Sequence, residues 1–397
     1  MKPKYVIIVP DGAADNPQDI FGGKTVIEAA ETPHMDAIAA QGRQGIVQTV
    51  PRGLQPGSDV AMMSLLGYDP QKNYTGRAPI EAAAQDIPLE QGDWVFRCNL
   101  VTTADGLMAD HSAGHISTKE GSELIREFEQ LINNPNFRFY PGVGYRHLCV
   151  IHGTDFAKVE TCPPHDFIGE KVSKILPKGR NSELLKELIA KSVQFFDNHP
   201  INRVRKDLKE NPVTSVWLWG QGQRAFLEKF SKVYGKSGVA ITAVDLVRGL
   251  AKLIGFDLIK VEGATGYLDT NYAGKGQAAI EALNKYDVVL VHIEAPDEAG
   301  HNGSPHQKKK AIEMIDKHIV GPVFNALKQH EQWRILVMPD HPTPVDTRCH
   351  CDQPVPFVMA GTGIKGILQK PFSEPNSFAS GFRIERGADL MEYFLKL

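Results

Sequence analysis

The chain has 397 residues, enough to bury a large core and typical of two or three domains. Hydrophobic residues make up 42% and charged residues 23%, as in an ordinary globular protein. The net charge of −3 gives no reason to expect nucleic acid or an anionic membrane as a partner.

No apolar stretch approaches the ~20 residues of a membrane helix. The apolar segment near the N-terminus ends at Asp11, which is too short for a signal peptide. Five scattered cysteines do not make a disulfide framework and fit a reducing compartment. We therefore expect a cytoplasmic protein, as a monomer or a small homo-oligomer.

Strand and helix patterns alternate at both ends of the chain. The first part predicts a strand at 5–10, a helix at 32–42, a strand at 45–50 and a helix at 58–66. The last part predicts helix 240–254, strand 257–261, helix 275–285, strand 287–293, helix 305–328, strand 334–338 and strand 355–359. This alternation predicts an α/β fold, with a largely parallel sheet flanked by helices on both faces.

The middle of the chain has a different pattern. Segments 95–101 and 146–152 alternate apolar and polar residues, as half-buried strands do, and a polar helical stretch follows at 181–208. We interpret 69–236 as an α+β domain inserted into a core made of 1–68 and 237–397.

Metal-ligating residue types follow three of the predicted strands. In an open α/β sheet, sites form outside the carboxyl ends of the strands, and neighbouring ends lie ~5 Å apart. A single Asp at such an end is usually a turn or cap residue, but three coincident strand ends favour a site for one or two metal ions. Carboxylates and imidazoles without thiolates suit Mn²⁺, Zn²⁺ or Mg²⁺. The candidate ligands are Asp11, Asp297, His301, Asp340, His341 and His350.

Two other motifs have ordinary interpretations. Cys349-His350-Cys351 has no second cysteine pair at zinc-finger spacing, so only His350 is retained as a ligand. The basic run Lys308-Lys309-Lys310 is interpreted as the solvated face of a helix.

Ser58 is the candidate nucleophile. It follows Pro56-Gly57 and begins a predicted helix that it would cap, which could be its only role. The two roles are compatible, because a helix N-terminus favours phosphate and a metal ion beside the hydroxyl would make it an alkoxide nucleophile. Ser64 is a weaker candidate because it falls inside the helix.

Several motifs together resemble the archaeal-type cofactor-independent phosphoglycerate mutases of the alkaline phosphatase superfamily. They are Asp11-Gly12, Pro56-Gly57-Ser58-Asp59, Gly67-Tyr68-Asp69-Pro70, Gly76-Arg77-Ala78-Pro79, Asp297-Glu298-Ala299-Gly300-His301 and Asp340-His341-Pro342-Thr343-Pro344.

The resemblance implies an alkaline-phosphatase-like core with two divalent metal ions, commonly Mn²⁺. A serine would carry a phosphoryl group between the hydroxyls of phosphoglycerate, while the inserted domain would grip the substrate and close over the core. By motif, Asp297, His301 and His350 would hold one metal ion. The other would be held by Asp11, Ser58, Asp340 and His341.

The inserted domain departs from the family pattern at Asp110-His111-Ser112-Ala113-Gly114-His115. Archaeal members tend to be arginine-rich there, whereas the histidine-containing form resembles a bacterial branch proposed to act as homoserine kinase. His111 is either a substrate contact or a histidine in a satisfied turn. Four other residues are candidate substrate contacts, with a structural salt bridge or a surface position as the alternative: Arg97, Arg146, Arg77 and Lys275.

Three functions remain open at this point. The first is a metal-dependent phosphoglycerate mutase working through phosphorylated Ser58. The second is a kinase-type transfer from ATP to a small alcohol such as homoserine. The third is a metal-binding protein without catalysis. In the first two, the partner is a small phosphorylated or hydroxylated metabolite.

Overall fold

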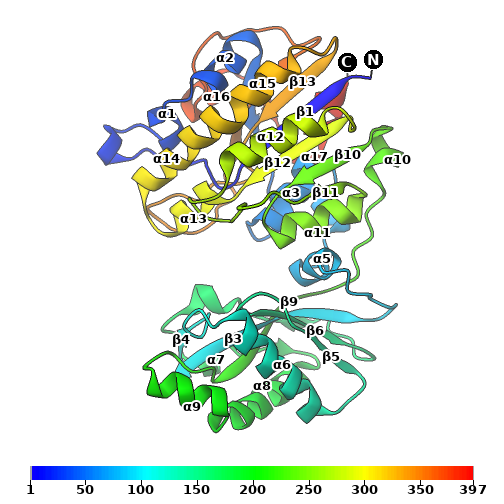
Figure 1. Ribbon diagram of the computed structural model, residues 1–397, viewed down its shortest axis with the longest axis vertical. Helices are drawn as coiled ribbons and strands as arrows, with labels where there is room; N and C mark the ends of the chain where they lie inside the picture. Colours follow the sequence, from blue (N-terminus) through cyan, green and yellow to red (C-terminus); the bar gives the residue numbers. More distant parts are fainter. Residues whose placement is uncertain (1, 397) are drawn as a thin grey trace. The chain divides into compact units, whose positions relative to one another are not determined.

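The structure is a computed structural model that describes residues 2–396, and it divides into two compact units (Figure 1). The core unit comprises residues 2–74 and 226–396, and the inserted unit comprises residues 75–225. Segments 69–74 and 226–236, which the sequence assigned to the inserted domain, belong to the core unit. Across residues 2–396, no helix has both the length and the apolar character to cross a membrane.

The core unit contains an eight-stranded sheet in the order β11-β10-β12-β1-β13-β14-β2-β15. Its strands are β1 (Lys4–Pro10), β2 (Arg43–Val47), β10 (Gly238–Ile241), β11 (Asp257–Ile259), β12 (Val288–Ile293), β13 (Trp333–Val337), β14 (Val355–Gly361) and β15 (Arg383–Ile384). Only β14 runs antiparallel to its two neighbours. The predicted α/β class with a largely parallel sheet is confirmed.

Strand β1 lies between β12 and β13 in the middle of this sheet. Its Ile7 is in register with Leu290 on one side and Leu336 on the other. All three strands are largely apolar and buried on both faces, as central parallel strands are. Their carboxyl ends therefore deliver three chain segments to one edge of the sheet.

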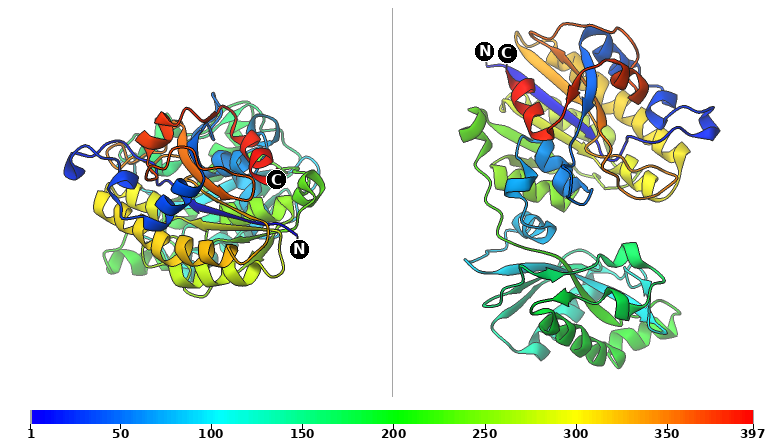
Figure 2. Two further views of the ribbon diagram at one scale, coloured as in Figure 1. Left: turned by 90° about the horizontal axis from the view of Figure 1, so that it is seen from above. Right: turned by 180° about the vertical axis from the view of Figure 1, so that it is seen from behind.

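Helices cover both faces of the core sheet. One face packs against α2, α12, α14 and α15 in a single apolar cluster (Figure 1). On the other face lie α3 and α17, where the Tyr5 ring meets Phe394 with centroids 5.7 Å apart (Figure 2). The helices of this unit are α1 (Val26–Ala29), α2 (Pro33–Gln41), α3 (Ser58–Leu65), α4 (Pro70–Asn73), α10 (Phe230–Tyr234), α11 (Asp245–Ile254), α12 (Tyr272–Ala282), α13 (Ala295–His301), α14 (Pro305–Ile315), α15 (Gly321–Leu327), α16 (Glu374–Ala379) and α17 (Gly387–Leu395).

Two predicted helices differ from the observed elements. Range 240–254 is the end of strand β10 followed by α11, because a run of four apolar residues is compatible with either element. Range 305–328 is α14 and α15 joined by a π-helical turn, Asp316–Val320. Pro322 follows that turn and lacks the N–H of a regular helical bond, which fits a wider turn at this point.

The inserted unit is built on an antiparallel sheet in the order β4-β3-β6-β5. Strand β9 also pairs with β3, along the edge opposite β6. Its strands are β3 (Trp94–Ala104), β4 (Leu107–Asp110), β5 (Phe137–Tyr140), β6 (Arg146–Ile151), β9 (Ser215–Gln223) and the short pair β7 (Val159–Glu160) and β8 (Lys178–Gly179). Its helices are α5 (Arg77–Ala84), α6 (Thr118–Ile132), α7 (Val172–Ile175), α8 (Ser182–Asp197) and α9 (Pro200–Asp207). Helices α6 and α8 pack through Phe128 and Phe196 on one face of this sheet.

Strand β3 is not half-buried as its alternating pattern predicted. Its polar residues Arg97 and Asn99 are only 7% and 2% exposed. Glu81 pairs with Arg97, and the Trp219 indole donates to Asn99, so the polar face is covered by satisfied partners.

Candidate functional site

The first group of candidate ligands is built on helix α13. Asp297 and His301 follow a strand, as predicted, and lie four residues apart on one face of this short helix. His301 Nε2 is 3.2 Å from Asp297 Oδ2. His350, from the segment after β13, brings its Nε2 to 2.9 Å from His301 Nε2 and 3.5 Å from Asp297 Oδ1.

The geometry of this group directs its ligand atoms to one point. His301 Nδ1 donates to the carbonyl of Arg348 (2.9 Å), which leaves Nε2 facing Asp297. Burial acts to raise the pKa of Asp297, but hydrogen bonds from His301 and His350 outweigh it and hold that pKa well below its usual range. Burial acts to lower the pKa of His301, yet Asp297 raises it to about 9. Positive charge is therefore stabilised at this position.

The second group gathers at the ends of β1 and β13. His341 Nε2 lies 3.4 Å from Asp11 Oδ1 and 3.5 Å from Asp340 Oδ2, and all three side chains are buried. Ser58 Oγ is 3.1 Å from His341 Nε2 and 3.3 Å from Asp11 Oδ2. The rings of His341 and His350 have centroids 4.2 Å apart, so the two groups adjoin.

Ser58 does not cap its helix, contrary to the sequence-based expectation. Gly57 occupies the cap position and Ser58 is the first residue of α3. The neighbouring Asp59 accepts from the Val60 N–H (2.9 Å) and from the Tyr74 hydroxyl (2.5 Å). Asp59 thereby binds the first turn of the helix, and the Ser58 hydroxyl is left to face Asp11 and His341.

The core site fits divalent cations on its own geometry. Within residues 2–396, three of its buried carboxylate oxygens accept no hydrogen bond: Asp11 Oδ1, Asp340 Oδ2 and Glu294 Oε2. Burial, and then the nearby carboxylates led by Asp340, raise the pKa of Asp11 well above its usual value. Buried oxygens without a donor are costly, and cations bound to carboxylate and imidazole ligands would satisfy them.

His292 and Glu294 also belong to this site, although neither was among the ligands predicted from the sequence. Together with Asp11 they form a third group with ligand atoms in reach of one another. Burial lowers the pKa of His292 to about 4, so the imidazole is neutral. Its Nε2 donates to Asp11 Oδ2 (2.7 Å) while its Nδ1 faces the Thr242 hydroxyl (3.2 Å), which orients Asp11. The sequence did carry one indication of this, because His292 is a histidine inside an otherwise apolar predicted strand.

Gly12 is required where the first strand enters the site. Its φ of +62° is in the left-handed region that favours glycine. A Cβ at this position would lie 2.4 Å from Asp297 Oδ1. The close approach of the β1 loop to α13 therefore depends on the missing side chain.

Lys275 lies in the core unit and is not the surface lysine that was the alternative interpretation. It is 1% exposed, and its Nζ donates to the carbonyl of His292 (3.2 Å). Burial lowers its pKa to about 8, against the opposing effect of Glu294. The Lys275 side chain thus contacts β12, the strand that carries His292.

The inserted unit pairs two predicted substrate residues, Arg77 and Arg97, with one carboxylate. Glu81 is 3.1 Å from Arg77 Nε and 2.9 Å from Arg97 Nε. Burial acts to raise the pKa of Glu81, but Arg97, Arg77 and Arg146 lower it. The Arg97 guanidinium also stacks 4.3 Å from the Trp219 ring centroid. We call Arg77, Arg97, Arg146 and Glu81 the arginine cluster.

His111 connects to this cluster through aromatic contacts. Its ring meets Tyr145 edge-on with centroids 5.5 Å apart, and the Arg146 guanidinium lies 4.7 Å from the same Tyr145 ring. The preceding Asp110 accepts from Ser112 N and Gly114 N (both 2.7 Å), so it forms the turn that carries His111. The structure therefore brings four of the five predicted substrate contacts together in the inserted unit.

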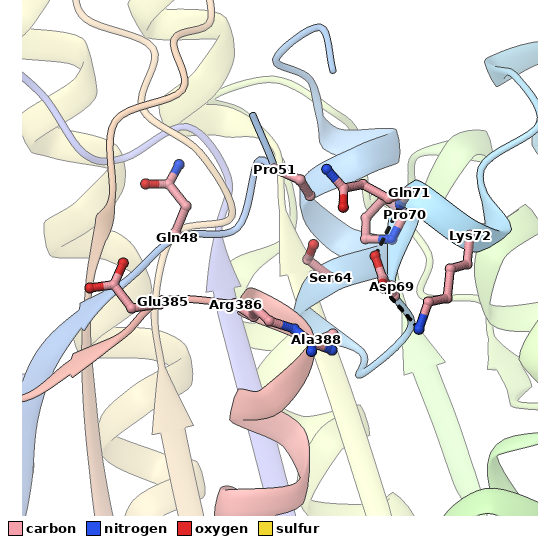
Figure 3. Close-up of a pocket in the computed structure, with 11 residues that line it drawn as sticks. Gln48, Pro51, Ser64, Asp69, Pro70, Gln71, Lys72, Glu385, Arg386 and Ala388 are labelled. Atoms are coloured by element: carbon pink, nitrogen blue, oxygen red, sulfur yellow. Dashed lines mark hydrogen bonds and ion pairs between the residues drawn. The ribbon is translucent and has the colours of Figure 1, made fainter. Parts of the chain in front are cut away.

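A cavity of about 260 Å³ in the core unit lies apart from the candidate ligands (Figure 3). It is lined by residues that include Gln48, Ser64, Asp69 and Arg386, and by none of the predicted metal ligands. Ser64 is therefore placed at the far end of α3 from Ser58. This excludes it from the metal-ligand groups.

The fold and the site define a class: an α/β protein with an inserted domain, whose sheet gathers carboxylates and imidazoles around a serine. Residues 39–202 match the family model described as 2,3-bisphosphoglycerate-independent phosphoglycerate mutase. A protein of that name from Methanosarcina mazei is 50% identical over 360 residues, which cover 90% of this chain and 91% of the relative. Another, from Methanothrix thermoacetophila, is 45% identical over 394 residues and 99% of each chain.

The chain belongs to the family of 2,3-bisphosphoglycerate-independent phosphoglycerate mutases, and the resemblance found in its motifs is confirmed. A solved structure of the PH0037 protein from Pyrococcus horikoshii has the same fold. The two share 28% identity with a TM-score of 0.84, over 100% of this chain and 97% of that one.

Proposed function

We propose that this chain is a metal-dependent phosphoglycerate mutase that interconverts 3-phosphoglycerate and 2-phosphoglycerate through phosphorylated Ser58. No 2,3-bisphosphoglycerate is needed, and the reaction is a step of glycolysis in the cytoplasm. The observation that carries the proposal is the position of Ser58, whose Oγ lies within 3.3 Å of both Asp11 and His341. Membership of the mutase family supports the choice of substrate.

The metal centre is proposed to hold two divalent cations, Mn²⁺ first, with Zn²⁺ or Mg²⁺ as alternatives. Asp297, His301 and His350 would hold one of them. The other would be held by Asp11, Ser58, Asp340 and His341. When bound, the cations would supply the positive charge that favours a serine alkoxide and neutralises a phosphoryl group.

Ser58 is proposed to carry the phosphoryl group between two substrate hydroxyls. Its Oγ attacks phosphorus and gives its proton to the Asp11 carboxylate, which lies in reach and has a second oxygen beside any that binds a cation. The bond from phosphorus to the first substrate oxygen breaks, and that oxygen takes up the proton from Asp11. In the return step the second substrate hydroxyl gives its proton to Asp11 and attacks phosphorus, the bond from phosphorus to Ser58 Oγ breaks, and Oγ takes the proton back. The N-terminus of α3 favours the phosphate at this position.

The arginine cluster and His111 of the inserted unit are proposed to bind the anionic substrate, and Lys275 of the core unit is proposed as a separate contact. Arg77 and Arg97 pair with Glu81, Arg146 also lowers the pKa of that carboxyl, and guanidinium groups of this kind suit a carboxylate or a phosphate. Planar guanidinium groups bind both anions through paired hydrogen bonds.

The direct test is conversion of 3-phosphoglycerate by Mn²⁺-loaded protein without bisphosphoglycerate. Ser58→Ala should abolish conversion, and mass spectrometry should detect phosphoserine only in the wild type. Ser64→Ala is the matched control, because Ser64 is a buried serine of the same helix whose hydroxyl has no partner among residues 2–396. Full activity of Ser58→Ala would rule out this mechanism.

A parallel assay separates the alternatives. The His111 segment motivates the kinase-type reaction, so ATP and homoserine are offered to the same Mn²⁺-loaded sample. Homoserine phosphorylation without mutase activity would replace the proposed function. Metal binding with neither activity and with unmodified Ser58 would favour the protein without catalysis.

A further inference from the structure

Lys308 is a fully buried lysine on α14 that the proposed metal centre does not include. The sequence placed it on a solvated basic face, but its side chain is 0% exposed, whereas Lys310 of the same helix is exposed. Its Nζ donates to Asp15 Oδ2 (2.7 Å) and to the carbonyls of Ala14 (3.2 Å) and Thr343 (2.8 Å). A buried ammonium is costly unless it is paired and hydrogen-bonded in this way.

The ion pair joins two loops that carry candidate ligands. Asp15 follows Asp11 in the loop after β1, and Thr343 follows His341 in the loop after β13. Asp15 also accepts from the backbone N–H of Val345 (3.3 Å), which fastens the second loop again. The buried ion pair therefore joins both loops, which also meet where the Thr343 N–H faces the carbonyls of Gly12 and Ala14 (both 3.3 Å).

Thr343 connects this ion pair to a ligand of the other group. Its carbonyl accepts from Lys308, and its hydroxyl donates a short hydrogen bond to Asp297 Oδ1. Gly300 of α13 packs against the same residue, since a Cβ there would lie 2.4 Å from the Thr343 oxygen. Thr343 is thus held between α14 and α13 and can take few other positions.

We propose that Lys308 is a positioning residue for the metal centre. Its ion pair with Asp15 fixes Thr343, and the Thr343 hydroxyl orients Asp297 as a ligand. This inference rests on the proposed function, because it takes Asp297 as a metal ligand. Loss of a hydrogen-bond partner of a metal ligand typically weakens metal binding by about 10- to 100-fold.

The test is Mn²⁺ titration by calorimetry, with electron paramagnetic resonance of the bound ion, on four proteins: wild type, Lys308→Met, Thr343→Val and the double variant. Both single variants should bind Mn²⁺ about 10-fold more weakly. The double variant should bind no more weakly than Thr343→Val, because both changes remove the same effect on Asp297. Lys310→Met is the matched control and should bind as the wild type does.

One further variant keeps the proposal separate from a general loss of stability. Lys308→Met leaves Asp15 buried without its partner, so Lys308→Met/Asp15→Asn removes both charges and should still bind Mn²⁺ weakly while folded. Wild-type affinity in that variant, or fully additive losses in the double variant with Thr343→Val, would overturn the positioning role. A wild-type protein that binds no Mn²⁺ would instead overturn the metal centre itself, and this inference with it.

Discussion

The two units gather charged side chains with opposite imbalances. In the core unit, the carboxylates of Asp11, Glu294, Asp297 and Asp340 converge, and three of their buried oxygens find no donor among residues 2–396. In the inserted unit, Arg77 and Arg97 pair with Glu81, and Arg146 also lowers the pKa of that carboxyl. A buried surplus of negative charge favours cations, and a surplus of positive charge favours an anion. Under the proposed function, metal ions would bind in the core unit and the arginine cluster of the inserted unit would bind the anionic substrate.

The largest expected effect comes from removing metal ions from the core unit. Chelation should abolish mutase activity, and Mn²⁺ at a hundred times its Kd should restore it and stabilise the fold by about 2.7 kcal/mol. Hydrogen exchange should accelerate in α13 and in the loop after β13, and should stay unchanged in β3 of the inserted unit. Equal activity and equal melting temperature with and without chelator would show that the core unit does not use a metal ion.

The next effect belongs to the inserted unit alone. Arg97→Met should raise the KM for 3-phosphoglycerate by about 10- to 100-fold, because a charged hydrogen bond is worth about 1.5–3 kcal/mol. Its Mn²⁺ affinity should equal that of the wild type. Arg138→Met is the control, since Arg138 pairs with Glu129 on an exposed part of the same unit. An unchanged KM in Arg97→Met would remove the arginine cluster from substrate binding.

The candidate ligands at the strand ends could be predicted because each one is marked by the apolar segment directly before it in the sequence. Asp11, Asp297 and Asp340 each follow an apolar strand, and parallel strands bring such positions to one edge of a sheet. The order β12-β1-β13 was not in the sequence pattern, yet the residue types alone suggested that the three strands are neighbours. The α/β class followed from the same alternation.

Other features could not be predicted because they depend on tertiary contacts. The Lys308 side chain is buried because it pairs with Asp15, which is 293 positions away in the sequence. A helical signal was nevertheless available, since Lys308 lies on the stripe of Ala311, Ile312 and Ile315, which are buried. The buried polar face of β3 likewise depends on Glu81, which belongs to another element.

A smaller effect concerns acid stability of the inserted unit. Burial lowers the pKa of His147 to about 3, so the native state holds this imidazole neutral. The unfolded chain takes up the proton first, and stability falls as the pH drops from about 6.5 towards 3, by about 1.4 kcal/mol per pH unit at most. Denaturant unfolding of His147→Gln should be less pH-dependent in this window. The same slope in both proteins would refute the assignment.

The smallest effect is the opposite pH response of a buried acid in the core unit. Burial raises the pKa of Glu374 to about 7, and the Thr25 hydroxyl (2.5 Å) and the Asp15 N–H (3.3 Å) bind its oxygens. The native state therefore keeps the proton that the unfolded chain loses, so this contribution is complete below about pH 4.5 and is lost as the pH rises to 7. Glu374→Gln should flatten the unfolding free energy between these values and leave the slope from His147 intact. The two windows overlap between about pH 4.5 and 6.5 with opposite signs, so slopes that change in the same direction there in both variants would refute one of the two assignments.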